Sequence, residues 1–134
     1  MAEHLSSFAA SRPGLSLSAA ANLLVDEGLR MAAHPGIVFR DGPTGRRAGL
    51  AGGPDVWEVI RALESARSAE PGLSEGELLA LVIDNTGLPL RSVRTALAYW
   101  ASFPDEVGAQ IGSADQAEGE ALAAWRRQRD LLAR

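Results

Sequence analysis

The 134-residue sequence contains no cysteine and no lysine, and only 5% of its residues are aromatic. Without cysteine there is no disulfide framework, no thiolate metal ligand and no thiol nucleophile. No apolar run approaches the ~18 residues that a membrane-spanning helix needs, and residues 1–15 lack the layout of a signal peptide. We therefore expect a cytoplasmic protein. Because apolar residues still make up 46% of the chain, its core must consist mainly of Ala, Leu and Val, which suits closely packed helices.

Charge and side-chain chemistry argue against two broad classes of function. The chain has 13 arginines and 17 acidic residues, for a formal net charge of -4. This charge argues against unselective coating of nucleic acid, although a local basic face could still bind DNA. The two histidines, His4 and His34, lie far apart, and no nucleophile has a base nearby. The stretch "GPTGRR" lacks the Gly-Lys-Ser/Thr of a phosphate loop. We predict no catalysis, no metal site and no cofactor.

The first 33 residues read as a pair of helices. Residues 2–10 form a short helix that Pro13-Gly14 ends. A second helix starts with Ser16 or Ser18 as N-cap and stops at His34-Pro35-Gly36. Its apolar face is predicted to consist of Ala21, Leu24, Val25, Gly28 and Leu29, and its polar face of Asn22, Asp26, Glu27 and Arg30.

A β-hairpin is predicted next. Its strands are residues 37–39 and 47–50, and its turn lies in "RDGPTGRR", where Asp41-Gly42 and Thr44-Gly45 can host positive φ. The stretch Gly52-Gly53-Pro54 ends the hairpin and places Pro54 at the first position of a helix. The apolar stripe of that helix is Val56, Trp57, Ile60 and Leu63.

Two helices joined by a glycine turn follow. Ser74 and Glu77 form a capping box, and the first helix buries Leu78, Leu79, Val82 and Ile83. Gly87 supplies the left-handed residue that ends it. The inner face of the second helix is predicted to be Leu90, Val93, Leu97 and Trp100.

The C-terminal region is predicted as a brief helix, "PDEVGAQI", and then a separate last helix. The last helix starts at Ser113, with Gln116 as its capping partner. The predicted fold is mainly α, a small helical domain with one β-hairpin that resembles a winged helix-turn-helix. Its three parts are the helical pair 1-33, the winged helix-turn-helix-like domain 34-112 and the C-terminal helix 113-134.

Two sets of residues could contact DNA. The second helix of the pair carries a polar outer face, which suits base edges and phosphates in a major groove; its members are Arg91, Ser92, Arg94 and Thr95. Arg40, Arg46 and Arg47 flank the hairpin turn and could grip phosphates as a wing. The alternatives are ordinary packing of two helices joined by a turn and simple solvation of an exposed turn.

The C-terminal helix places an aromatic residue beside three arginines. Leu122, Trp125 and Leu132 could insert into a groove of a partner protein, and Arg126, Arg127 and Arg129 could pair with its acidic groups. The alternative is a helix packed on its own domain with a solvated charged face.

Residues 34 to about 112 resemble the family known as domain of unknown function four-three-three. The resemblance rests on "HPGIVFRDGPTGRRAGLAGGPDVWEVI" and on "GLPLRSVRTALAYWASFPDEVGAQI", which follow the order and spacing of the family's motifs. The passage "RRAGLAGGPD" is longer than the one usual in the family. The resemblance implies a hairpin followed by helices.

The stretch "LSSFAASRPGLSLSAAANLLVDEGLRM" resembles the two helices of a ribbon-helix-helix unit. Only Met1 to His4 precede this stretch, in the place where the family has a strand, so we expect these helices to dimerise without reading DNA through a strand. Proteins of this combined kind look like VapB-type antitoxins. The resemblance implies a homodimeric autorepressor that binds operator DNA, while its C-terminal segment neutralises a PIN-domain ribonuclease toxin. The alternative is a protein–protein interaction module that does not bind DNA.

Overall fold

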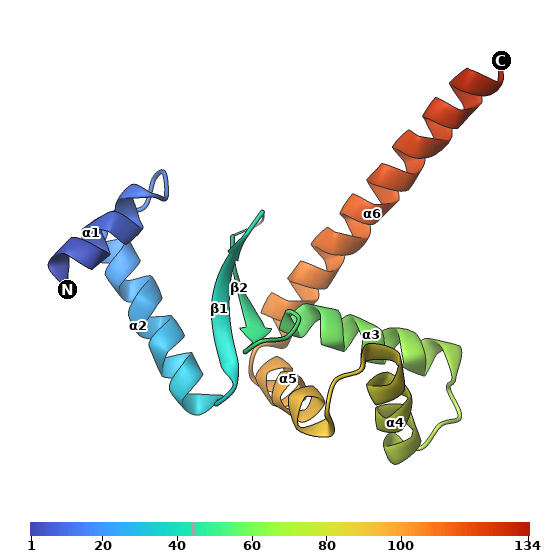
Figure 1. Cartoon of the computed structure of the whole chain (residues 1–134), viewed down its shortest axis with the longest axis horizontal. Helices are drawn as coiled ribbons and strands as arrows, with labels where there is room; N and C mark the ends of the chain where they lie inside the picture. Colours follow the sequence, from blue (N-terminus) through green and yellow to red (C-terminus); the bar gives the residue numbers. More distant parts are fainter. Residues whose placement is uncertain (44) are drawn as a thin grey trace.

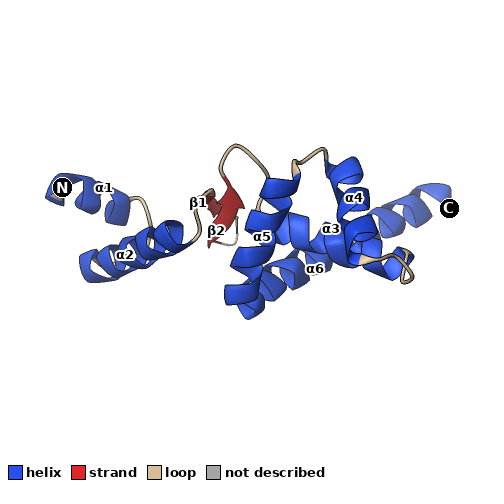
Figure 2. Cartoon of the chain, turned by 90° about the horizontal axis from the view of Figure 1, so that it is seen from below, coloured by secondary structure: helices blue, strands red, loops and turns tan. Residues whose placement is uncertain are grey.

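A computed structural model describes residues 1–43 and 45–134 (Figure 1). Helices dominate it, and one antiparallel hairpin interrupts them, so the predicted mainly α class with one hairpin is confirmed. Along the chain the elements are α1 (Ala2–Ala10), α2 (Leu17–Ala33), β1 (Ile37–Gly42), β2 (Gly45–Leu50), α3 (Val56–Ala69), α4 (Glu75–Thr86), α5 (Leu90–Ser102) and α6 (Pro104–Ala133). The pair α1–α2 lies at one end of the molecule and the C-terminus at the other (Figure 2). None of the helices in the described part of the chain has the length and apolar character needed to cross a bilayer.

The N-terminal pair forms as predicted, but α2 turns a different side to the protein. Ser16 caps the helix, since its hydroxyl accepts a hydrogen bond from the Ala19 N–H at 3.1 Å. Glu27, predicted to face away, is buried, whereas Val25 and Leu29 of the predicted apolar face are 62% and 66% exposed. The reason is that polar partners on the hairpin hold the Glu27 side of α2 inward. The apolar side is left uncovered.

The hairpin pairs Ile37 with Leu50 at its base and Gly42 with Gly45 at its tip. Gly45 adopts φ +110°, a conformation that favours glycine. Thr44, also proposed for the turn, lies outside the described residues. Ile37 and Leu50 stand opposite each other and are both buried against the helices. This packing supplies the support that an isolated hairpin lacks.

Helix α3 begins at Val56, two residues later than predicted. Pro54 and Asp55 continue the extended path of the hairpin: the Leu50 N–H donates to the Pro54 carbonyl at 2.9 Å, and Asp55 forms an isolated bridge with Gly49. Asp55 is therefore the N-cap residue, although its side chain makes no capping hydrogen bond. That side chain is used by the hairpin instead.

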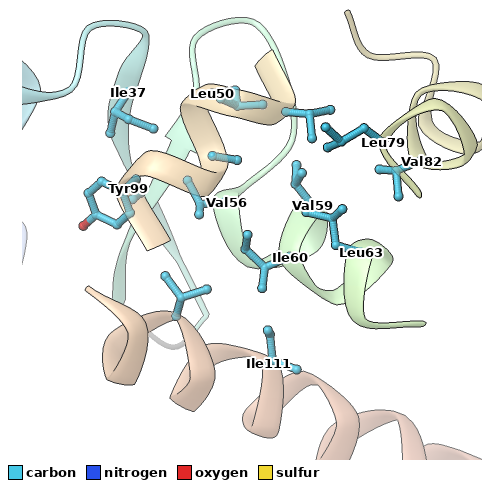
Figure 3. Close-up of a cluster of buried hydrophobic side chains, with 14 of the residues drawn as sticks. Ile37, Leu50, Val56, Val59, Ile60, Leu63, Leu79, Val82, Tyr99 and Ile111 are labelled. Carbon is cyan, nitrogen blue, oxygen red and sulfur yellow. The ribbon is translucent and has the colours of Figure 1, made fainter. Parts of the chain in front are cut away.

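The core lies where α3 crosses the other elements (Figure 3). The predicted stripe of α3 is confirmed at Val56, Ile60 and Leu63, which are buried, while Trp57 is half-buried. Apolar side chains from every later helix and from the hairpin surround them: Ile37, Ala48, Leu50, Leu79, Val82, Val93, Ala96, Tyr99, Val107 and Ile111.

The helical pair α4–α5 has the predicted cap and turn. The capping box of Ser74 and Glu77 is complete, and Gly87 adopts φ +74° at the end of α4. Leu79 and Val82 are buried, while Leu78 and Ile83 are half-buried.

The buried side of α5 differs from the prediction. It consists of Val93, Ala96 and Tyr99, whereas Leu90 is 41% exposed and Leu97 and Trp100 are half-buried. The buried side differs because α5 packs against both α3 and the hairpin, and the Phe39 ring of β1 lies beside the Tyr99 ring.

Residues 104–133 form one continuous helix, so the two helices predicted there are wrong. Ser113 lies inside α6 and caps nothing, and the Gln116 amide donates to Glu120 Oε1 at 3.2 Å, one turn further on. Ala, Glu, Gln and Arg dominate residues 113–133 and favour uninterrupted helix. Only the first part of α6 enters the core, and the remainder projects away from the body (Figure 1). We call residues 119–134 the arm.

Candidate binding surfaces

Asp55 holds two arginines of the hairpin. Arg40 and Arg47 face each other directly across the two strands, an arrangement that would be repulsive by itself. The Asp55 carboxylate accepts from Arg40 Nη1 at 3.0 Å and from Arg47 Nε at 2.5 Å, and it also accepts from Trp57 Nε1 at 3.1 Å. With 6% of Asp55 exposed, this carboxylate is a buried centre that joins β1, β2 and the start of α3.

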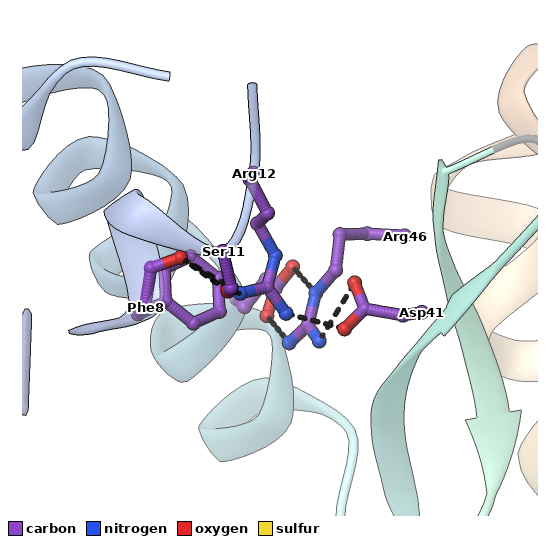
Figure 4. Close-up of polar contacts among 6 residues, drawn as sticks. Phe8, Ser11, Arg12, Asp41 and Arg46 are labelled. Carbon is purple, nitrogen blue, oxygen red and sulfur yellow. Dashed lines mark hydrogen bonds and ion pairs between the residues drawn. The ribbon is translucent and has the colours of Figure 1, made fainter. Parts of the chain in front are cut away.

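Arg46 joins the hairpin to α2. Its Nε and Nη2 donate to the two carboxylate oxygens of Glu27 at 2.9 and 2.5 Å, a two-point contact in which only 4% of the Glu27 side chain is exposed. The hydrogen bond to Glu27 is the largest cause of the raised pKa of the Arg46 guanidinium. Arg12, in the loop after α1, forms an ion pair with Asp41 on β1. The guanidinium groups of Arg12 and Arg46 both lie over the Phe8 ring (Figure 4).

All three hairpin arginines that were predicted to grip phosphates therefore have carboxylate partners inside the protein. Arg40 and Arg47 share Asp55, and Arg46 is held by Glu27. These contacts give the arginines a structural task, which is to fix the hairpin between α2 and α3.

A second polar cluster connects α2 with α5 and α6. Arg30 Nη1 donates to Tyr99 OH and to Glu106 Oε1, each at 2.9 Å, and Tyr99 OH donates to Glu106 Oε2 at 2.7 Å. Arg30 also lies over the Phe103 ring, 3.9 Å from its centre. Burial and the hydrogen bond to Glu106 raise the pKa of Tyr99, so the phenol stays protonated. The cluster fixes the C-terminal part of α2 to the base of α6.

Fewer residues of the predicted polar face of α5 are exposed than the sequence indicated. Arg91 and Arg94 are exposed, and within the described residues neither makes an ion pair. Ser92 and Thr95 are half-buried, and the Thr95 hydroxyl donates to the Arg91 carbonyl at 2.9 Å. The cationic part of this face therefore consists of the two arginines.

The arm carries the exposed apolar side chains of α6. Leu122, Trp125 and Leu132 are 46%, 55% and 80% exposed. Arg126 and Arg127 are exposed as well, and Arg129 lies 5.6 Å above the Trp125 ring. Arg61 of α3 pairs with Asp115 and Glu118, and these pairs tie α6 to the body just before the arm. The six residues predicted to bind a partner protein are thus together on one free helical segment.

The N-terminal pair also leaves apolar surface open. A groove of about 460 Å³ runs between α1 and α2 and is lined mostly by apolar side chains, among them Leu5, Phe8 and Leu24. Val25 also lines it, and Leu17 and Leu29 are more than half exposed on α2. Val25 and Leu29 belong to the apolar face that the sequence predicted for α2, and no other described part of the chain covers these two residues.

Sequence reasoning missed Arg12, Glu27, Arg30, Asp55 and Tyr99 as organising residues. Arg30 and Tyr99 are 69 residues apart, and Arg46 and Glu27 are 19 apart, so local spacing carries no signal for either contact. For Asp55 the sequence did contain a signal, because an acidic residue follows a hairpin whose two strands carry arginines at opposed positions.

Comparison with known proteins returned no match. No protein-family model, no curated protein and no solved structure is similar enough to the chain to match it. The functional assignment therefore rests on the surfaces of the chain itself.

Proposed function

We propose that this protein is an antitoxin-type binding protein: the arm neutralises a PIN-domain ribonuclease, the α5 face contacts operator DNA, and the N-terminal pair joins two copies. The single observation that carries the proposal is the arm. Its side chains Leu122, Trp125 and Leu132 are 46%, 55% and 80% exposed, and the rest of the described chain does not cover them.

The composition of the arm defines the surface that it fits. Leu122, Trp125 and Leu132 recur at intervals of three and seven residues, which places them on one side of a helix. A helix of this kind suits an apolar groove in a partner, with the aromatic residue as anchor. A rigid helix of 15 residues, 119–133, reaches about 22 Å from the body.

The charge of the arm indicates that the rim of the partner's groove is acidic. The arm has four arginines (Arg126, Arg127, Arg129 and Arg134) against Glu120 and Asp130, so its net charge is +4 - 2 = +2, whereas the whole chain is at -4. Guanidinium groups pair in two-point fashion with carboxylates. An acidic metal site, such as that of a PIN-domain ribonuclease, offers carboxylates, and arginines lodged there would compete with the metal ion.

DNA contact is the second part of the proposal and depends on fewer residues than the sequence indicated. The arrangement α4, Gly87 turn, α5 suits a helix-turn-helix in which α5 enters the major groove. Arg91 and Arg94 are the side chains available for bases and phosphates, and a dimer would present four such arginines. The hairpin supports α5 as a wing would, but Arg40 and Arg47 share the Asp55 carboxylate, so we assign these two no phosphate contact.

A protein–protein interaction module without DNA binding is the second candidate. The observation that favours it is the pairing of the hairpin arginines, which leaves the body with little free positive charge. Replacing Arg91 with Ala discriminates the two. An operator-binding protein should lose affinity by about 1–3 kcal/mol if Arg91 contacts a base, and a module that never binds DNA should be unaffected.

The arm is tested by co-expression with the product of the reading frame adjacent to this gene. The full chain should co-purify with that product and suppress its ribonuclease activity. A chain ending at Glu118 retains the Arg61 ion pairs and the core, so it should stay folded but lose co-purification.

Point variants on the two sides of the arm provide the matched control. Trp125→Glu and Leu122→Glu should abolish co-purification, whereas Ala123→Glu, on the opposite side of the helix, should leave it intact. An adjacent product without ribonuclease activity, or equal co-purification of all three variants, would contradict the proposal.

A further inference from the structure

Next to Asp41, two guanidinium groups have N–H donors that are not closely paired (Figure 4). Arg12 Nη2 donates to Asp41 Oδ2, and Arg46 Nη1 lies 3.5 Å from Asp41 Oδ1, longer than a good charge-assisted hydrogen bond. Arg12 Nε is buried and has no hydrogen-bond partner among the described residues. Asp41 thus accepts closely from Arg12 Nη2, while Arg46 Nη1 stays at 3.5 Å and Arg12 Nε has no partner among the described residues.

The two guanidinium groups are held in place independently of Asp41. Arg12 Nη1 donates to the Phe8 carbonyl at 2.9 Å and to Ser11 Oγ at 2.8 Å, and its guanidinium lies 3.6 Å from the centre of the Phe8 ring. Arg46 is fixed by the two-point contact with Glu27. Asp41, in contrast, has a side chain that is 59% exposed, so it can turn into solvent.

We propose that Arg12 and Arg46 form a binding site for a phosphate group, and that Asp41 occupies this site in the free protein. A phosphate group has tetrahedral oxygens that can accept from Arg12 Nε and Nη2 side by side and also from Arg46 Nη1. The Asp41 carboxylate accepts closely from Arg12 Nη2 alone. When Asp41 turns away, two guanidinium cations remain beside one carboxylate, Glu27, which leaves a charge of +1 to attract the anion.

The site is independent of the proposed function, because it lies between the α1–α2 loop and the hairpin and includes neither the arm nor α5. The phosphate could belong to a DNA backbone, or it could be a free or terminal phosphate. Both present the same oxygens to the two arginines.

Asp41→Asn tests the proposal because it removes the competing charge and retains the side-chain size. Calorimetric titration with inorganic phosphate should show binding to the wild-type chain and about two- to fivefold tighter binding to Asp41→Asn, the range expected when one exposed ion pair is removed. Arg12→Gln should bind at least about tenfold more weakly, and Arg12→Lys should also weaken binding, because lysine keeps the charge but loses the fork. Asp84→Asn, an exposed acid on α4, is the matched control and should behave as wild type.

A parallel titration with a short DNA duplex identifies the source of the phosphate. If Asp41→Asn also binds the duplex more tightly and with a steeper salt dependence, the site serves the DNA backbone. If only inorganic phosphate responds, the site serves a free or terminal phosphate. If Asp41→Asn binds neither probe more tightly than Asp84→Asn does, with circular dichroism showing both variants folded, the proposal is overturned.

Discussion

Replacing Asp55 with Ala should cause a large loss of stability from a single side chain. The Asp55 carboxylate accepts hydrogen bonds from Arg40, Arg47 and Trp57. Without it, two guanidinium groups stand opposite each other across the hairpin, and an indole N–H loses its acceptor. The hairpin and the start of α3 would both loosen, because both are fixed to the same carboxylate.

The size of the effect follows from how deeply the partners are buried. Breaking a buried ion pair from one side is worth about 3–5 kcal/mol. Here the Asp55 side chain is 7% exposed, but those of Arg40 and Arg47 are 33% and 19% exposed, so water compensates part of the loss. We expect about 2–4 kcal/mol, a large fraction of the ~5–15 kcal/mol by which a typical domain is stable.

Urea unfolding followed by far-ultraviolet circular dichroism measures this change. The urea midpoint should fall, and the slope of the free energy against urea concentration should stay the same, because the surface area exposed on unfolding is nearly unchanged. Asp84→Ala removes an exposed carboxylate and should change the free energy of unfolding by less than about 0.5 kcal/mol. If Asp55→Ala were as mild as Asp84→Ala, the carboxylate would not be what holds the opposed arginines.

Three further predictions concern other elements. In the folded chain the pKa of Tyr99 is raised above its ordinary value of 10.0, so the unfolded chain loses the phenol proton at a lower pH than the folded chain does. The free energy of unfolding should therefore decline as pH rises above 10, and Tyr99→Phe should lose this part of the pH dependence. The near-ultraviolet absorbance of tyrosinate measures the titration of the chain's single tyrosine. Ser74→Ala should lower the free energy of unfolding by about 1 kcal/mol through loss of the α4 cap, and an unchanged urea midpoint would show that the cap adds nothing. Val25→Glu with Leu29→Glu should convert a dimer to a monomer in light scattering, whereas Ala80→Glu, at an exposed position of α4, should not; a wild-type monomer would refute the N-terminal interface.

Elements fixed by local chemistry were predictable from the sequence. Ser16, the capping box at Ser74 and the left-handed Gly87 each act within one turn of chain, and all three are confirmed. Hairpin pairing is equally local, since the two paired strands follow each other closely along the chain.

The errors arise where a distant partner decides the outcome. Glu27 has the spacing of a solvent-facing residue, yet Arg46 on the hairpin draws it into the interior. Pro54 has the sequence context of a first helical residue, but pairing with the end of β2 keeps it extended and delays α3. The prediction of a helix start at Ser113 treated this serine as a cap, but α6 continues through it, because no neighbouring residue ends the helix.

For the candidate surfaces, composition found the arm and the α5 arginines but could not assign the hairpin arginines. Arg40, Arg46 and Arg47 look alike in the sequence, as cations beside an exposed turn. Their carboxylate partners come from α2 and from the residue before α3, and only the tertiary fold brings these groups together.

The two ends of the molecule are coupled to the body in different ways. The base of α6 is anchored in the apolar core through Val107 and Ile111, whereas α1 and α2 are held largely by the ion pairs of Arg12, Arg30 and Arg46. Salt screens charge pairs that are partly exposed but leaves apolar packing intact or strengthens it.

High salt should therefore loosen the N-terminal pair selectively. Limited proteolysis should then cleave faster between α2 and β1, at residues 34–36, while the junction of α5 and α6 stays protected. Arg30→Met should give the same cleavage at low salt, because it removes the ion pair with Glu106 and the hydrogen bond to Tyr99. Cleavage at residues 34–36 that does not depend on salt in the wild-type chain would mean that apolar contacts, and not the arginines, hold the two parts together.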